Sequence, residues 1–112
     1  MINWKPFDSL HVLQEVIRKS YVQRVFIFKH SSRCSISSIA KLRLEDHWNS
    51  SLSENSEVYL LDVITHRDIS NEVAAYFEVH HESPQILLIE NGECTHDASH
   101  FDISVEEIQE VI

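Results

Sequence analysis

Cys34 is the residue of this chain whose type and position best suit covalent chemistry. It follows an apolar run rich in β-branched and aromatic residues, 25–28, which predicts a buried strand. After it, apolar residues recur every four positions, as on one face of a helix: Ile36, Ala40, Leu44 and Trp48. Cys34 is therefore expected where a strand passes into a helix N-terminus. The unpaired N–H groups of such a terminus stabilise a thiolate, which makes the cysteine a nucleophile near neutral pH.

Polar residues close to Cys34 are candidate ligand contacts. Lys29 and Arg33 suit the carboxylate of a small thiol ligand, and the alternative is that they are solvent-facing charges at a strand end. His30 either exchanges a proton with the thiol or is an ordinary hydrogen-bonded loop residue. Ser35 offers a hydroxyl directly after the cysteine. We expect this polar segment, from Lys29 onward, to end the strand.

The elements that position Cys34 follow from hydrophobic spacing and from turn and cap residues. Polar, turn-forming residues 49–56 predict a loop, and Asn91-Gly92 predicts a two-residue hairpin turn. The predicted order is a short strand in 2–6, a helix capped by Asp8 to about Lys19, the strand and helix around Cys34, a strand 57–63, a helix capped by Ser70, strands 85–89 and 93–96, and a last helix 105–112 capped by Ser104 with Glu107.

This order predicts an α/β fold. Strand–helix–strand units require parallel strands and right-handed crossovers, whereas the hairpin adds an antiparallel strand. The layer rules then give a mixed sheet of about four strands with helices on both faces. Because the 112 residues contain no internal repeat and no linker, we expect a single domain over 1–112.

Composition narrows the possible partners and the location. The formal net charge of −9 repels phosphate backbones, so we expect no nucleic-acid partner. No apolar run approaches the roughly 20 residues of a membrane span, and the first ten residues show no signal-peptide pattern. We therefore expect a cytoplasmic protein without a membrane partner, present as a monomer or weak dimer, in which both cysteines are free thiols.

The histidines and the second cysteine raise two further possibilities, a metal site and a resolving thiol. The chain has eight histidines, but no Cys-x-x-Cys or His-Glu-x-x-His spacing, so we expect no metal site. Cys94, in the predicted return strand, is either a resolving partner for Cys34 or a structural residue. A disulfide requires the two Cα atoms to come within about 7 Å, which favours the structural interpretation.

Three separated segments carry a family resemblance: FKHSSRCSISS at 28–38, HESPQILLIENGE at 81–93 and ASHFDIS at 98–104. They resemble the monothiol bacilliredoxins of bacteria, also described as YtxJ-like general stress proteins, within the thioredoxin-like superfamily. The resemblance spans nearly the whole chain. It implies a thioredoxin-like fold and thiol–disulfide exchange that needs no metal or organic cofactor.

The resemblance also implies roles for particular residues. Cys34 would attack mixed disulfides between client proteins and bacillithiol or a similar small thiol, which makes S-thiolated proteins and the small thiol the expected partners. Ser83 and Pro84 match the loop that carries a cis-proline opposite the cysteine. Two residues depart from the pattern. Ser35 stands where the family commonly has proline, and Ser37 stands where the superfamily has its second cysteine, so no local thiol can resolve an adduct.

Two other functions remain open from the sequence. One is a thioredoxin-like binding or stress module without turnover, which the missing second cysteine permits. The other is an iron–sulfur carrier of the monothiol glutaredoxin type. Those proteins carry Cys-Gly-Phe-Ser, whereas this chain reads Cys-Ser-Ile-Ser from residue 34 and lacks the glycine.

Overall fold

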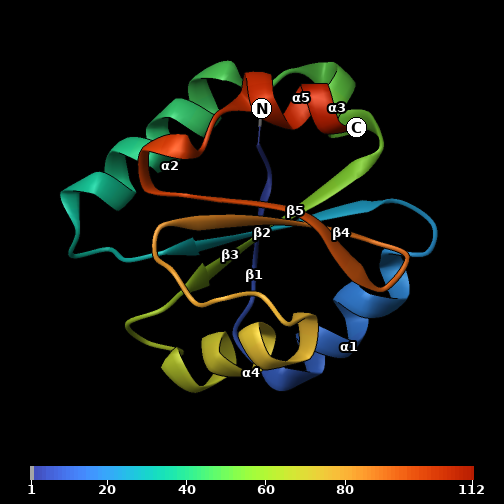
Figure 1. The fold of residues 1–112 in the computed structure, drawn as a ribbon, viewed down its shortest axis with the longest axis vertical. Coiled ribbons are helices and arrows are strands. Elements are labelled where there is room, and N and C mark those ends of the chain that lie inside the picture. The colour runs from blue at the N-terminus through green and yellow to red at the C-terminus, as the bar shows by residue number, and fades with distance from the viewer. Residues whose placement is uncertain (1) are drawn as a thin grey trace.

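A computed structural model describes residues 2–112 as a five-stranded sheet between two helical layers (Figure 1). Helices α2, α3 and α5 cover one face, and α1 and α4 cover the other. The elements are β1 (Trp4–Pro6), α1 (Leu10–Lys19), β2 (Arg24–His30), α2 (Ser35–His47), α3 (Ser50–Glu54), β3 (Ser56–Asp62), α4 (Arg67–Phe77), β4 (Gln85–Glu90), β5 (Glu93–Ser99), the 3-10 turn η1 (His100–Asp102) and α5 (Val105–Val111).

The sheet has the order β1-β3-β2-β4-β5. The first three strands in this order are parallel, and β4 and β5 each run antiparallel to the strand before them. The predicted mixed sheet with helices on both faces is therefore confirmed. Five strands form because the short N-terminal segment does pair, at the edge beside β3.

Alternation along β2 assigns its side chains to two separate cores. Phe26 and Phe28 pack in the core under α2, while Val25 and Ile27 pack in the core with α1 and α4. All four are at most 1% exposed, as expected for a central strand covered on both faces. The same alternation places the next two residues, Lys29 and His30, on opposite faces of the sheet.

The expected loop at 49–56 is wrong, because this segment contains the short helix α3. The side chain of Asn49 accepts a hydrogen bond from the backbone N–H of Leu52 at 3.1 Å and so caps the helix. Leu52 is fully buried and anchors the turn to the core under α2. One cap and one apolar anchor therefore outweigh the turn-forming composition of this run.

The predicted helix caps are correct in one case of three. Ser104 caps α5 by accepting from the N–H of Glu107 at 3.1 Å. The N-cap of α1 is Ser9, not Asp8. Helix α4 begins at Arg67, so Ser70 lies inside it and is fully buried.

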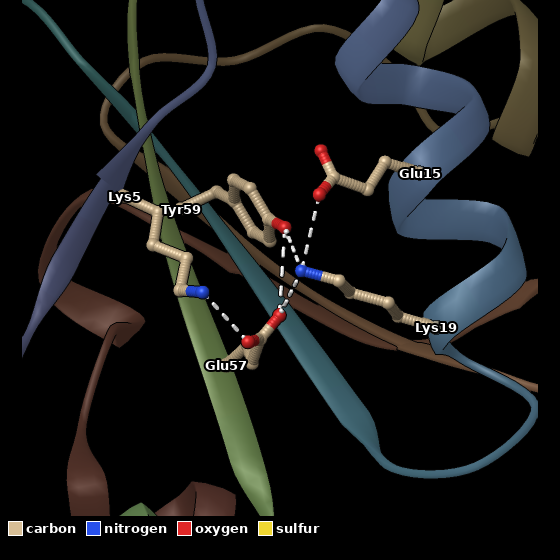
Figure 2. Close-up of polar contacts among 5 residues, drawn as sticks. All are labelled: Lys5, Glu15, Lys19, Glu57 and Tyr59. Atoms are coloured by element: carbon tan, nitrogen blue, oxygen red, sulfur yellow. Dashed lines mark hydrogen bonds and ion pairs between the residues drawn. The ribbon is translucent and has the colours of Figure 1, made fainter.

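A cluster of charged residues joins the edge strand β1 to β3 and α1 (Figure 2). Glu57 on β3 contacts the ammonium groups of Lys5 and Lys19, each at 2.8 Å. Lys19 also donates to the hydroxyl of Tyr59 at 3.1 Å and pairs with Glu15 at 3.2 Å. Burial alone would raise the pKa of Glu57, but the two ammonium groups lower it below its usual value. The same carboxylate raises the pKa of Lys19.

Glu57→Gln should destabilise the chain by about 1–3 kcal/mol at neutral pH, because two charge-assisted contacts are lost. Since the folded pKa of Glu57 is lowered, its contribution is present above pH 4.5 and disappears as the pH falls further. Urea unfolding of both proteins from pH 7 to pH 3 measures this difference. Glu15→Gln, which removes only the 3.2 Å pair, is the control and should cost less. A pH-independent difference for Glu57→Gln would contradict the assignment.

Candidate functional site

Cys34 lies between β2 and α2 and is the N-cap residue of α2, as the spacing predicted. Its backbone N–H donates to the carbonyl of Ser31 at 3.1 Å, and its own carbonyl accepts from the N–H of Ser38 at 3.1 Å. The side chain is partly exposed. A thiol at this position is open to a reaction partner and lies at the positive end of a 13-residue helix.

The loop with Ser83 and Pro84 lies at the same end of the sheet as Cys34. Strand β4 pairs antiparallel with β2, with Gln85 opposite Lys29, so the loop before Gln85 is level with the end of β2. The Ser83-Pro84 peptide bond is cis. The carbonyl of Pro84 accepts from His100 at 3.0 Å, and the buried hydroxyl of Ser83 has no hydrogen-bond partner among the described residues.

His30 is held by Ser37 on the α2 side of the sheet. The hydroxyl of Ser37 lies 2.6 Å from Nδ1 of His30 and accepts from the N–H of Ser31 at 3.0 Å. The ring also stacks on Phe28, with centroids 5.8 Å apart. Burial, and then the charge of Lys41, lower the pKa of His30. Nδ1 of His30 is therefore bonded to Ser37. In the sequence, Ser37 was notable only because it stands where the superfamily has its second cysteine.

Lys29 fits neither of the two alternatives from the sequence, a contact to the carboxylate of a small thiol or a solvent-facing charge at the strand end. Lys29 is part of β2 and is fully buried on the α1–α4 side. Its ammonium group donates to the carbonyl of Ser70 at 3.1 Å and lies 3.3 Å from Nδ1 of His81. Burial, with a smaller effect of Arg67, lowers the pKa of Lys29 to about 8. A ligand carboxylate in solvent does not reach this group.

Arg33 and Ser35 flank Cys34 and are both exposed. They are the two members of the predicted polar set that solvent and a ligand reach freely. The structure therefore divides that set: Arg33 and Ser35 stay beside the thiol, while Lys29 and His30 enter separate networks on opposite faces. Ser70, predicted from the sequence only as a helix cap, and His81, for which no role was predicted, complete the Lys29 network.

Cys94 is remote from Cys34. It pairs with Ile89, which pairs with Val25 at the start of β2, whereas Cys34 follows the end of that strand. At about 3.3 Å per residue, the length of β2 separates the two cysteines by well over the roughly 7 Å that a disulfide spans. The Cys94 thiol donates to the carbonyl of His96 at 3.3 Å, and burial, with Asp97, raises its pKa to about 11.

Residues 5–108 match the family Monothiol bacilliredoxin BrxC. The chain belongs to this family. Within residues 2–112, no group of three or more His, Cys, Asp or Glu side chains is arranged to bind a metal ion. The helices of the same part of the chain include none with the length and apolar character needed to cross a membrane.

Solved structures show the same thioredoxin fold as this bacilliredoxin-family chain. A protein described as a proposed oxidoreductase with a thioredoxin fold is 30% identical, with a TM-score of 0.80, over 95% of this chain and 90% of that one. The Malassezia sympodialis thioredoxin Mala s 13 is 15% identical, with a TM-score of 0.76, over 98% and 88% of the two chains. Mitochondrial thioredoxin 3 from Saccharomyces cerevisiae is 15% identical, with a TM-score of 0.70, over 96% and 91%. Family and fold together support a thiol redox function and, in general terms, a small-thiol partner.

Ser37→Ala tests whether Ser37 organises the segment before the bacilliredoxin cysteine. The change leaves the N–H of Ser31 and Nδ1 of His30 without their shared partner, so we expect a loss of about 1–3 kcal/mol in unfolding free energy. Urea unfolding at neutral pH measures it. Ser38→Ala removes an exposed hydroxyl from the next position of the helix and should change stability far less. Equal losses in the two variants would contradict the role of Ser37.

Lys29→Met tests the burial of the ammonium group. Because the pKa of Lys29 falls from 10.5 to about 8 on folding, the unfolded chain binds more protons than the folded chain between these values. Wild-type stability should therefore rise relative to the variant across this window, by on the order of 3 kcal/mol. Urea unfolding at about pH 7 and pH 10 gives the difference. Lys41→Met, at a partly exposed lysine, should show no such trend. A constant gap between wild type and Lys29→Met would contradict the prediction.

Proposed function

We propose that this chain is a monothiol thiol–disulfide oxidoreductase that uses Cys34 to remove bacillithiol, or a similar small thiol, from protein mixed disulfides. The observation that supports it best is the placement of one accessible cysteine at the N-terminus of α2, at the same sheet end as the cis-proline loop. The other cysteine, Cys94, lies level with the start of β2, at the opposite end of the sheet from Cys34, and its thiol has a raised pKa.

The reaction proceeds in two exchanges. The Cys34 thiolate attacks the small-thiol sulfur of the mixed disulfide, a new disulfide forms between Cys34 and the small thiol, and the client leaves as a thiolate that takes up a proton. A second molecule of small thiol, as its thiolate, then attacks this adduct. The small-thiol disulfide leaves and Cys34 is restored. The electrons that reduce the client therefore come from small thiol in solution.

Four residues are proposed to contact the incoming disulfide. Arg33 and Ser35 are exposed beside Cys34 and suit polar groups of the small thiol. The backbone of Ser83 and the ring of Pro84 suit the client segment, since this loop lies level with the end of β2.

We also propose that the chain acts in a bacterial cytoplasm as a general stress protein. The two free cysteines support this location, because a reducing compartment keeps thiols unpaired.

Intact-protein mass spectrometry tests the proposal. After incubation with oxidised bacillithiol, and separately with oxidised glutathione, wild type and Cys34→Ala should differ by one small-thiol adduct, present only in wild type. Cys94→Ala is the matched control and should retain the adduct, because the remaining thiol is the reactive one. Thermal unfolding establishes that each variant is folded.

A mixed disulfide between a peptide and bacillithiol then measures turnover. Wild type should release the free peptide thiol in the presence of added small thiol, and Cys34→Ala should not. An adduct without peptide release would favour a binding module without turnover. Adduct formation that persists in Cys34→Ala would exclude Cys34 as the exchanging thiol.

A further inference from the structure

Lys29 carries a buried ammonium group without a carboxylate. No ion pair among residues 2–112 includes it, and its partners are the carbonyl of Ser70 and Nδ1 of His81. Removing an unpaired charge from water is unfavourable, and an apolar side chain of similar volume often serves stability equally well. Stability alone therefore does not account for a lysine at this position of a central strand.

The contacts of Lys29 join three separate segments. Lys29 itself is the penultimate residue of β2, five positions before Cys34. Ser70 lies in the first half of α4 and is fully buried, and its hydroxyl is 3.2 Å from the same His81 nitrogen. His81 belongs to the loop between α4 and β4. The end of β2, the body of α4 and this loop thus meet at one ammonium group.

The loop is attached on both sides of its cis-proline. His81 lies two residues before Ser83 and is fixed by Lys29 and Ser70. Gln85, directly opposite Lys29 in the sheet, follows Pro84 and donates from its amide nitrogen to the carbonyl of His80 at 2.9 Å. Neighbouring residues of β2 and β4 therefore set where the loop lies relative to Cys34.

We propose that Lys29 is a positioning residue, which acts through His81 to fix the loop of Ser83 and Pro84 against Cys34 for exchange with a mixed disulfide. This inference rests on the proposed function. Lys29 contacts no substrate, because it is fully buried. Its effect on the reaction is confined to the distance and orientation between the loop and the thiol.

The charges around Lys29 make the network sensitive to pH. The ammonium group contacts Ser70 from α4 and His81 from the loop, and the charge of Arg67 from α4 lowers its pKa. His80 and Glu82, on either side of His81, act on that imidazole, and Gln85 from β4 lies opposite Lys29 in the sheet. Burial and then Lys29 itself lower the pKa of His81, so the imidazole is neutral and free to accept from the ammonium group. Deprotonation of Lys29 removes the charge from this hydrogen bond, and the exchange rate should change across that transition.

Two reactions at Cys34 separate positioning from thiol activation. Alkylation by iodoacetamide requires only the thiolate, whereas exchange with a peptide–bacillithiol disulfide also requires the loop. In Lys29→Met we expect alkylation within about twofold of wild type and exchange at least tenfold slower, without the wild-type change in rate near pH 8. Arg43→Met, which removes an exposed positive charge from α2, is the control and should leave both rates near wild type.

A double-mutant cycle tests the route through His81. His81→Ala should slow exchange to a similar extent, and the double variant should be no slower than the slower single variant, because both changes break the Lys29–His81 contact. Exchange at the wild-type rate in Lys29→Met would overturn the inference. Equal losses of alkylation and exchange, or additive losses in the double variant, would also overturn it.

A measurement without turnover separates this inference from the proposed function. Backbone amide NMR signals of residues 80–85 should shift in both Lys29→Met and His81→Ala, whether or not wild type exchanges disulfides. Signals that shift in both variants, together with a wild-type chain that forms no adduct, would refute the proposed function and retain the structural link. Unchanged loop signals in both variants would refute the link.

Discussion

The antiparallel pairing of β2 with β4 is the constraint on which the site depends. Its register places Gln85 opposite Lys29 and so brings the loop before Gln85 level with the residues that lead into Cys34. The pairing of β4 with β5, whose register shifts between Leu88 and Ile89, places Cys94 level with the start of β2, away from the site. A shift of one residue would reverse the faces of every β4 side chain and also move the loop relative to Cys34, so this register sets the site as well as the core.

Consecutive residues of β2 organise the two sides of the site. His30 points to the α2 side, where Ser37 holds it, and Lys29 points to the α4 side, where Ser70 and His81 hold it. One network contacts the segment before Cys34, and the other contacts the loop before the cis-proline. The alternation of β2 side chains thus sends two adjacent polar residues to opposite faces of the sheet.

The position of Cys34 could be predicted because a change from strand to helix spacing is a local signal. The central strands and the Asn91-Gly92 hairpin could be predicted for the same reason, because their sequence signals are also local. The burial of Lys29 could not be predicted, since a lysine after an apolar run normally ends a strand and its partners lie 41 and 52 residues away. Helix α3 was missed because the buried position of Leu52 is a tertiary feature that outweighs a serine-rich composition.

The hydrogen bond between Ser37 and His30 has a consequence for how an adduct on Cys34 would be released. A dithiol protein carries both electrons for one reduction within its own fold and clears its own intermediate. Here the position that would hold the second thiol serves as a hydrogen-bond anchor, so under the proposed function an adduct on Cys34 would persist until a thiol arrives from solution. The lifetime of that adduct would then be a property of the surrounding thiol pool rather than of the fold, and the occupancy of Cys34 would follow how reduced that pool is.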